Sequence, residues 1–257
     1  MLTSLKNPLI KQIRKLHTRK HRRAQNLFLL EGTNLIEAAC ELGYPLETVC
    51  YTSQWQAKNP DLFAQCEKQG NRIELVSEEV LSAIATTVNP DGIVATAPRQ
   101  SGKSPNLSTV QLGIILEQLQ DPGNMGTIIR TAVATGVDGI WASENSVEWD
   151  HPKVLRASVG AWFHLPMTVT SDIPSLIQEF PGQVVATLPT AEKTYWEVDF
   201  QQPTLILLGN EGEGLSPELA SLATEKVKIP LGGGVESLNV AIAASLLLYE
   251  AKRQTNH

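Results

Sequence analysis

Three glycine-rich segments combine tight turns with polar side chains of the kind that act on a bound substrate. They span residues 121–126, 208–215 and 229–239. Glycine has no Cβ, so main-chain N–H and C=O groups in such segments can approach a ligand closely. For any one segment the alternative is ordinary turn and cap chemistry, with Ser237 as a helix N-cap. Three of them in one half of the chain favour a binding site. Its candidate polar side chains are Asn124, Arg130, Glu211, Ser237 and Asn239.

Apolar runs typical of buried strands precede two of these segments, and a helix follows the third. Residues 111–119 lead into the first segment, and residues 204–210, the most apolar run of the chain, lead into the second. The third opens the last predicted helix, from Ser237 to about Arg253. Open parallel sheets bind ligands beyond the carboxyl ends of their strands. The spacing therefore predicts that such a sheet gathers the three segments at one edge.

Strands and helices alternate along both halves of the chain, which predicts an α/β fold in each. We expect a small α/β domain in residues 1–100, a linker rich in Gly, Ser, Pro and Asn in 101–109, and a second α/β domain with a mainly parallel sheet in 110–257. In the first half the expected strands are 28–32, 48–53, 72–77 and 92–98, and the expected helices are 33–42, 61–69 and 78–86. In the second half the expected strands are 111–119, 139–143, 165–170, 184–188 and 204–210, and the expected helices are 124–135, 151–159, 173–180 and 237–253.

The charge is distributed unevenly along the 257 residues, whose net charge is -6. The first 30 residues carry +8 without a single Asp or Glu, so the remainder carries -14. Leucine and isoleucine recur at helical spacing in this basic segment, which predicts one amphipathic helix over about residues 6–23. A local basic face on an acidic protein indicates contact with a polyanion, nucleic acid first, although a merely solvated helix face is the alternative. A membrane-surface helix is disfavoured, because the apolar stripe is narrow and lacks Trp or Phe. The candidate contacts are Lys11, Arg14, Lys15, Arg19, Lys20, Arg22 and Arg23.

Several classes of protein are excluded by what the sequence lacks. No apolar run approaches the roughly 18 residues of a membrane span, and no apolar core of a secretory signal follows the basic N-terminus. Three cysteines without zinc-type spacing are typical of a reducing cytoplasm. No phosphate loop, dinucleotide fingerprint or metal-ligand spacing of histidines is present, so we expect neither phosphoryl transfer from a nucleotide nor a metal.

The three segments together resemble a known enzyme family. In order and spacing they are similar to the signature motifs of the SpoU (TrmH-like) RNA ribose methyltransferases, members of the SPOUT superfamily. The N-terminal part resembles the ribosomal-protein-like RNA-binding domain that many members carry. Departures are small: Leu231 stands where methionine is common, and Ala241 where serine is common. The stretches that carry the resemblance are NPLIKQIRKL, FLLEGTNLIEAA, DPGNMGTIIRTA, LLGNEGEGLS and IPLGGGVESLNVAIA.

This resemblance implies a fold, a methyl donor and roles for residues. It implies a deep trefoil knot in the second domain, which general folding rules would never predict. It also implies S-adenosylmethionine as methyl donor and transfer of its methyl group to a ribose 2′-hydroxyl by the five polar residues given above. A guanidinium stays protonated in proteins, so we favour Arg130 as an orienting group fixed by a carboxylate such as Glu211, with a general-base role left open. The donor contacts carried over by motif are Leu208, Gly209, Ile229, Leu231 and Leu238.

Two further expectations concern the surroundings of the last helix and the RNA that is modified. Residues 237–253 are apolar nearly all round, which predicts burial in a core or a subunit interface. Since family members pair through this region, we expect a symmetric homodimer. Ribosomal RNA of the large subunit is the favoured substrate because of the N-terminal domain. Transfer RNA, a resistance methylation of the ribosome, and a non-catalytic RNA-binding or ribosome-assembly protein on the same fold are the alternatives.

Overall fold

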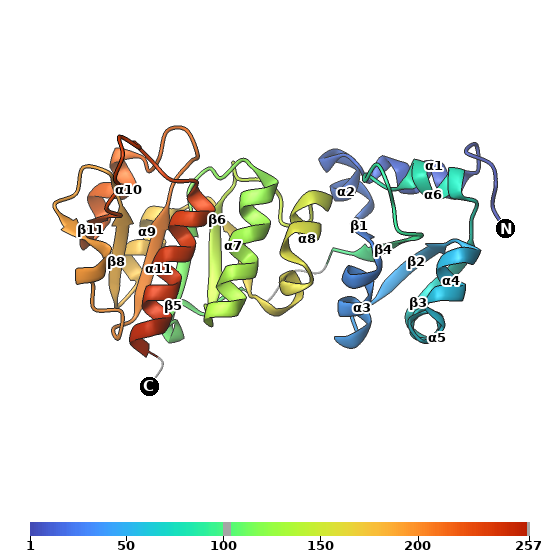
Figure 1. The fold of residues 1–257 in the computed structure, drawn as a ribbon, viewed down its shortest axis with the longest axis horizontal. Coiled ribbons are helices and arrows are strands. Elements are labelled where there is room, and N and C mark those ends of the chain that lie inside the picture. Colours follow the sequence, from blue (N-terminus) through green and yellow to red (C-terminus); the bar gives the residue numbers. More distant parts are fainter. Residues whose placement is uncertain (100–103, 256–257) are drawn as a thin grey trace. The chain divides into compact units, whose positions relative to one another are not determined.

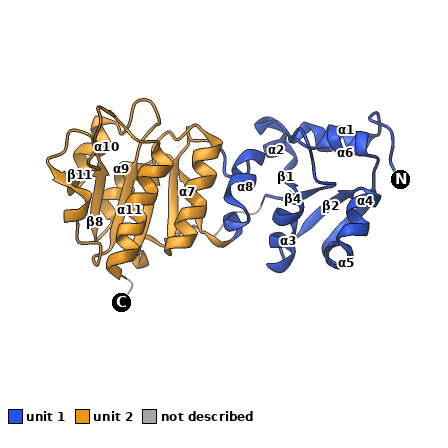
Figure 2. Ribbon diagram, in the orientation of Figure 1, with its two compact units in different colours: residues 1–100, 148–163 blue, residues 101–147, 164–257 orange. Residues whose placement is uncertain are grey.

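The chain folds into two compact units in a computed structural model, which describes residues 1–99 and 104–255 (Figure 1). Unit 1 comprises residues 1–100 and 148–163, and unit 2 comprises residues 101–147 and 164–257 (Figure 2). The chain therefore returns to unit 1 for one short segment before it ends in unit 2. Of the expected linker 101–109, residues 101–103 lie outside the described residues, and a 3₁₀ turn, η1 (Leu107–Thr109), ends it.

Unit 1 is a four-stranded sheet covered by helices. The strand order is β1-β4-β2-β3, with β4 antiparallel to both neighbours and β2 parallel to β3. All four strands expected here are confirmed, and α4 is a helix that the sequence pattern missed. The strands are β1 (Leu27–Glu31), β2 (Leu46–Tyr51), β3 (Gly70–Leu75) and β4 (Ile93–Pro98). The helices are α1 (Pro8–Lys15), α2 (Arg19–Gln25), α3 (Thr33–Glu41), α4 (Ser53–Lys58), α5 (Pro60–Gln69), α6 (Glu78–Ile84) and α8 (Pro152–Ser158).

The prediction of one basic helix over residues 6–23 is wrong, because two helices, α1 and α2, occupy this stretch. Leu16 ends α1, and Thr18 adopts an extended conformation (φ -110°, ψ 141°) before α2 begins. The break lets Ile10, Ile13 and Leu16 enter a core that α6 also lines. Burial of this apolar stripe outweighs the continuation of a helix, since propensity alone is a weak determinant.

Unit 2 is a seven-stranded sheet of order β7-β6-β5-β10-β8-β11-β9, in which every pairing of described strands is parallel. Central strand β10 (Thr204–Leu208) is buried at all five positions, as its continuous apolar run predicts. The other strands are β5 (Leu112–Leu116), β6 (Gly139–Ser143), β7 (Met167–Thr170), β8 (Gln183–Thr187), β9 (Lys193–Thr194) and β11 (Glu225–Lys228). The α-helices of this unit are α7 (Pro122–Thr135), α9 (Ile173–Glu179), α10 (Pro217–Leu222) and α11 (Val240–Thr255).

The C-terminal helix α11 packs against α7, so the chain turns back from β11 across the sheet to the helix that follows β5 (Figure 1). Ala241, Ala244, Leu247, Leu248 and Ala251 form its buried face. α11 begins at Val240 rather than at the expected Ser237. The small alanines allow the close approach of the two helices.

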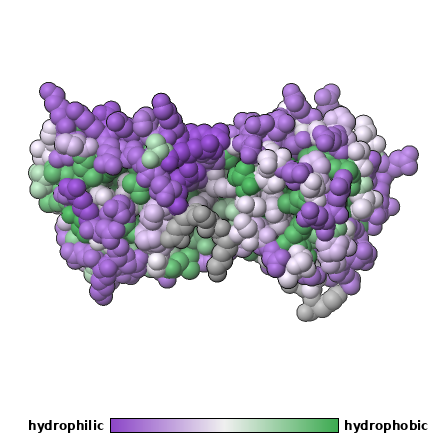
Figure 3. All heavy atoms as spheres, turned by 180° about the vertical axis from the view of Figure 1, so that it is seen from behind, coloured by the Kyte–Doolittle hydropathy of each residue, from purple (hydrophilic) through white to green (hydrophobic). Residues whose placement is uncertain are grey.

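The described helices contain none that is both long and apolar enough to cross a membrane. Hydrophilic residues cover much of the face drawn in Figure 3. Residues 1–99 and 104–255 contain no group of His, Cys, Asp and Glu side chains that could hold a metal ion.

Candidate active site

The first glycine-rich segment forms the N-terminus of α7 directly after β5. Pro122 stands in the first turn, where its missing N–H costs no hydrogen bond. The helix is capped by Asp121, whose Oδ1 accepts a hydrogen bond from the Asn124 N–H at 2.8 Å. The cap is thus Asp121 and not Asn124. The Asn124 side-chain amide is therefore available for contacts elsewhere.

Glu211, in the second segment, joins the ends of β5 and β10. Its carboxylate accepts hydrogen bonds from the N–H groups of Gln120 (3.1 Å) and Asp121 (2.9 Å) and from the Asn124 amide (3.2 Å). Partial burial tends to raise the pKa of Glu211, but these hydrogen bonds lower it below its ordinary value. The lowered pKa makes Glu211 a weak base, and its three hydrogen bonds make it a group that positions its neighbours.

Asn239, in the third segment, completes a chain of three side chains. Its Nδ2 donates a hydrogen bond to Asn124 Oδ1 at 2.9 Å. Its Oδ1 accepts from the N–H groups of Ala241 and Ile242 at 2.9 and 3.3 Å, which makes Asn239 the residue that caps α11. Ser237 lies exposed ahead of the helix, so the alternative in which it serves only as the N-cap is wrong. Glu211, Asn124 and Asn239 thus bring all three segments together.

Arg130 lies on α7, exposed to solvent. It shares a helix face with Gly123 and Thr127, at spacings of seven and three residues. Within the described residues its guanidinium makes no hydrogen bond and no ion pair, so the expected pairing with Glu211 is not formed. The Glu211 carboxylate is occupied by the α7 N-terminus instead. Ser237 likewise makes no hydrogen bond in the described part of the chain.

The residues expected to hold the methyl donor form a surface with bare backbone and apolar side chains. Leu208 is buried at the end of β10, and Gly209 lies so close to Gly214 that a Cβ would fall 2.1 Å from that backbone. Ile229 and Leu238 are half-buried, whereas Leu231 is 39% exposed. Gly233 and Gly234 have φ of +66° and +75° with open space beside them, a conformation and a clearance that favour glycine. These features fit a ligand with an apolar ring and hydrogen-bonding edges.

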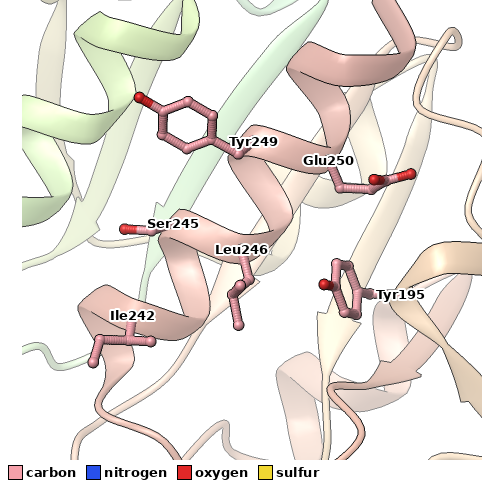
Figure 4. A pocket seen from close by; sticks show the side chains of 6 residues that line it. All are labelled: Tyr195, Ile242, Ser245, Leu246, Tyr249 and Glu250. Atoms are coloured by element: carbon pink, nitrogen blue, oxygen red, sulfur yellow. The ribbon is translucent and has the colours of Figure 1, made fainter.

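A hollow of about 450 Å³ lies on another part of unit 2, along the exposed side of α11 (Figure 4). Ile242, Leu246 and Tyr249 line it from the helix, and Tyr195 faces them from the 3₁₀ turn η3 (Tyr195–Glu197). Ile242 and Tyr249 are each more than half exposed. Large apolar side chains gathered on one exposed face are typical of an interaction surface.

The seven candidate RNA contacts differ in their surroundings, and Arg22 is not among the exposed ones. Arg22 is 2% exposed and donates hydrogen bonds to Glu148 (2.7 Å), Asp150 (3.4 Å) and the carbonyl oxygens of Leu16 and His17. The prediction that it contacts RNA is therefore wrong: a buried, fully paired guanidinium has a structural role. The remaining six side chains are exposed: Lys11, Arg14, Lys15, Arg19, Lys20 and Arg23.

Glu148 and Asp150 neutralise part of the basic segment from within unit 1. Arg19 and Arg23 pair with Glu148 at 3.1 and 2.7 Å, and Arg99 pairs with Asp150. Burial favours a higher pKa for Glu148, but the Arg23 hydrogen bond and the Arg22 charge lower it overall. Burial dominates at Asp150 and raises its pKa despite the arginines. Four exposed cations, Lys11, Arg14, Lys15 and Lys20, remain without an ion-pair partner among the described residues.

Sequence reasoning missed two features of these sites. Asn210 organises the second segment, because its Oδ1 accepts from the N–H groups of Gly212 and Glu213 and its Nδ2 donates to the Gln118 carbonyl. An Asn before a glycine-rich turn is a recognisable signal for such bonds. Glu148 and Asp150 gave no signal, because they lie more than 120 residues from Arg22 in the sequence.

Known proteins resemble this chain over nearly its whole length. Residues 111–249 match the model of the SpoU rRNA Methylase family, and residues 7–95 match the MRM3-like substrate binding domain. The chain is 49% identical to an uncharacterized tRNA/rRNA methyltransferase of Synechocystis over 98% of its own length and 93% of that protein. It is 32% identical to the 23S rRNA (guanosine(2553)-2′-O)-methyltransferase RlmP of Bacillus subtilis over 98% of both chains. The crystal structure of an AdoMet-bound rRNA methyltransferase from Sinorhizobium meliloti matches with a TM-score of 0.87 and 33% identity, over 100% of this chain and 98% of that one.

Proposed function

The chain belongs to the SpoU rRNA methylase family, and from this premise we propose that it methylates a ribose 2′-hydroxyl of large-subunit ribosomal RNA. The observation that carries the proposal is the hydrogen-bonded chain Glu211–Asn124–Asn239, which unites three separate segments. One relative matches this chain along nearly its whole length and is named as a 23S rRNA 2′-O-methyltransferase, which supports the substrate class. Transfer RNA is the second candidate, since the Synechocystis relative is named for either RNA.

S-Adenosylmethionine is the methyl donor of this enzyme, and when bound it supplies a methyl group already activated by a positive sulfonium. We assign its contacts to Leu208, Gly209, Ile229, Leu231 and Leu238. Bare main chain at Gly209 and in the 232–234 turn can read the edge of an adenine, while Ile229 and Leu238 can cover its face. The enzyme's own task is then to align the hydroxyl and accommodate its proton.

Arg130 is the group that we assign to the RNA. Its exposed guanidinium, free of ion pairs in the described structure, can bind a phosphate beside the reactive ribose and orient the hydroxyl. Glu211 holds the Asn124 amide and the start of α7 in place, and Asn239 fixes Asn124 from the other side. Ser237 is exposed and stands two residues before Asn239 in the sequence. We assign it to the substrate hydroxyl as a neutral hydrogen-bonding group.

Transfer of tritiated methyl from S-adenosylmethionine tests the proposed substrate. Purified protein should label ribosomal RNA from a strain that lacks the gene and leave RNA from the parent strain unlabelled. Label in transfer RNA alone would favour the second candidate. Absence of donor binding in calorimetry would favour a non-catalytic RNA-binding protein.

The same comparisons support an assignment of roles to the two parts of the chain. We propose that residues 1–100 bind the substrate RNA, that 101–109 link the domains, and that 110–257 form the methyltransferase domain. The family match over 111–249 supports this division, although residues 148–163 group with unit 1 in the structure. The return of α11 from β11 to α7 supports the knotted path that we propose for the second domain. A cytoplasmic location agrees with an RNA substrate.

Salt dependence tests the RNA contacts in unit 1. Replacing Lys11, Arg14, Lys15 and Lys20 together with glutamine should weaken RNA binding and reduce the slope of log affinity against log salt by up to about 3, at about 0.7 per lost contact to single-stranded phosphate. Filter binding at several salt concentrations measures both. The matched control is quadruple replacement of exposed residues outside the segment, Lys58, Lys68, Arg72 and Lys226, which should leave the slope unchanged. An unchanged slope in the first variant would mean that the basic face is only solvated.

We propose a symmetric homodimer through the exposed side of α11 and Tyr195. Tyr249→Glu should convert the dimer to a monomer, because it places a charge in an apolar contact that excludes water. Light scattering after gel filtration gives the mass directly. Val169→Glu is the control, since Val169 is similarly exposed (51%) but lies on edge strand β7. A Tyr249→Glu protein that stays dimeric would exclude this surface as the interface.

A further inference from the structure

Two cysteine thiols lie side by side in the interior of unit 1. Cys40 in α3 and Cys66 in α5 have their Sγ atoms 4.0 Å apart, and both are free thiols. Cys40 is 4% exposed and Cys66 is fully buried. The third cysteine, Cys50, lies in β2 and makes no contact with another thiol among the described residues. The methyl-transfer chemistry uses none of the three, so the pair has no role in the proposed reaction.

The positions of the two thiols are held by the packing of their helices. α3 and α5 contact each other, and both cysteines belong to one apolar cluster with Leu62 and Ala39. A hydrogen bond from the Gln69 amide to the Cys40 carbonyl, 2.7 Å long, ties the end of α5 to α3 directly. The helices therefore keep the sulfur atoms adjacent. Closing the gap to a disulfide bond of about 2.0 Å requires side-chain rotation and a small shift of packed helices.

The two sulfur atoms differ in reactivity. The hydrogen bond between the two thiols lowers the pKa of Cys40, whereas the same bond and burial both raise the pKa of Cys66. Cys40 therefore forms the thiolate more readily, and the thiolate is the nucleophile in thiol oxidation. Burial, together with the negative charge of Glu74, raises the pKa of Cys50 to about 12, so Cys50 stays a protonated thiol at neutral pH.

We propose that Cys40 and Cys66 form a reversible disulfide within unit 1 when the protein meets a hydroperoxide. The Cys40 thiolate attacks a peroxide oxygen, the O–O bond breaks, and Cys40 becomes a sulfenic acid. The leaving hydroxide or alkoxide takes up the proton that Cys40 released on ionisation and departs as water or an alcohol. The Cys66 sulfur then attacks the Cys40 sulfur, the S–O bond breaks, and water leaves with the Cys66 proton. The two thiols lose two electrons and two protons, which the peroxide receives. A dithiol reductant reverses the change by thiol–disulfide exchange.

The crosslink would act on the stability of the RNA-binding unit. It joins α3 to α5 and closes the chain between residues 40 and 66, including β2, the neighbour of β4. A crosslink between residues that are already adjacent in the fold mainly removes conformations of the unfolded chain. We expect the unfolding temperature of unit 1 to rise by several degrees on oxidation and to fall back on reduction.

Peptide mapping of the wild-type protein tests the proposal without any substitution. Reduced protein is treated with hydrogen peroxide, unfolded, alkylated with iodoacetamide and digested with a glutamate-specific protease and trypsin together. Cleavage after Glu41, Glu47 and Lys58 places Cys40, Cys50 and Cys66 in three separate peptides. Trypsin alone would leave Cys40 and Cys50 together, since no Lys or Arg lies between Arg23 and Lys58, and the glutamate-specific protease alone would leave Cys50 and Cys66 together in residues 48–67. The expected result is an intact mass lower by two hydrogens before alkylation, a crosslink between the Cys40 and Cys66 peptides, and alkylated Cys50. Added dithiothreitol should restore three alkylated cysteines.

Two variants complete the test. Cys50→Ser should form the crosslink as the wild type does, and Cys40→Ser should lose both the crosslink and the gain in unfolding temperature. If Cys40→Ser does not fold, the wild-type map still decides. The proposal is overturned if the peptides carry no crosslink after peroxide, if Cys40 is found as sulfinic or sulfonic acid, or if the link involves Cys50 or a second chain.

Discussion

Replacing Arg130 with alanine is expected to lower the rate of methyl transfer about 100-fold or more, while S-adenosylmethionine binds about as tightly as to the wild type. A preorganised charged donor at a reacting group contributes on this scale when it acts mainly in the transition state. Arg130 stands on α7, which carries none of the residues assigned to the methyl donor, and its guanidinium makes no hydrogen bond or ion pair in the described structure. Single-turnover assays with tritiated donor measure the rate, and calorimetry measures donor binding.

Arg130→Lys separates charge from geometry. A lysine keeps the positive charge but lacks the planar fork that binds a phosphate through two parallel hydrogen bonds. We therefore expect the lysine enzyme to recover only a small part of the lost rate. Arg72→Ala removes an exposed arginine from β3 in unit 1 and should leave the rate unchanged. If Arg130→Ala turns over at the normal rate, Arg130 has no part in the reaction.

Replacing Glu148 with alanine is expected to destabilise unit 1 by about 3 kcal/mol, because it leaves the buried Arg22 with only part of its compensation. Three arginines pair with this carboxylate within 3.1 Å, namely Arg19, Arg22 and Arg23. Hydrogen exchange in β1 and β4 should accelerate about 100-fold, since 1.4 kcal/mol corresponds to a factor of ten. Exchange in β10 of unit 2 provides the internal reference.

Two comparisons make the Glu148 result specific. Glu41→Ala removes an exposed carboxylate without an ion-pair partner in the described structure and should not change exchange in unit 1. The folded-state pKa of Glu148 is lowered, so its contribution is present above the ordinary glutamate pKa and disappears as pH falls through the lowered value. The difference between Glu148→Ala and wild type should therefore shrink in acid. Equal protection from hydrogen exchange in Glu148→Ala and the wild type at neutral pH would contradict a stabilising role of Glu148.

Hydrophobic patterning predicted the elements of the catalytic half well, because local chain periodicity reflects burial. The expected strand 139–143 coincides with β6, and the continuous apolar run 204–210 includes the fully buried β10. The helix expected at 151–159 also exists as α8. Its place in unit 1 could not be foreseen, because Leu155 joins that core only through contacts with residues distant in sequence.

The sequence allowed the residues of the candidate site to be predicted better than their hydrogen-bond partners. Glycine-rich turns after strands marked Asn124, Glu211 and Asn239, and the structure joins these three by hydrogen bonds. The partner of Glu211 could not be predicted, because its carboxylate is satisfied by backbone N–H groups that any residue carries. The burial of Arg22 could not be predicted either. In the sequence Arg22 resembles the exposed basic residues around it, and only the fold brings Glu148 next to it.

The central claim is that this enzyme methylates a ribose 2′-hydroxyl in large-subunit ribosomal RNA, and position-resolved mapping of the product tests it most directly. Ribosomal RNA from a strain lacking the gene is incubated with purified enzyme and S-adenosylmethionine, then mapped for 2′-O-methyl groups by resistance to alkaline cleavage. One new alkali-resistant position is expected in the large-subunit RNA with the wild-type enzyme and none with Arg130→Ala. Methyl groups found on a base, or no methylation of this RNA by an enzyme that binds S-adenosylmethionine, would contradict it.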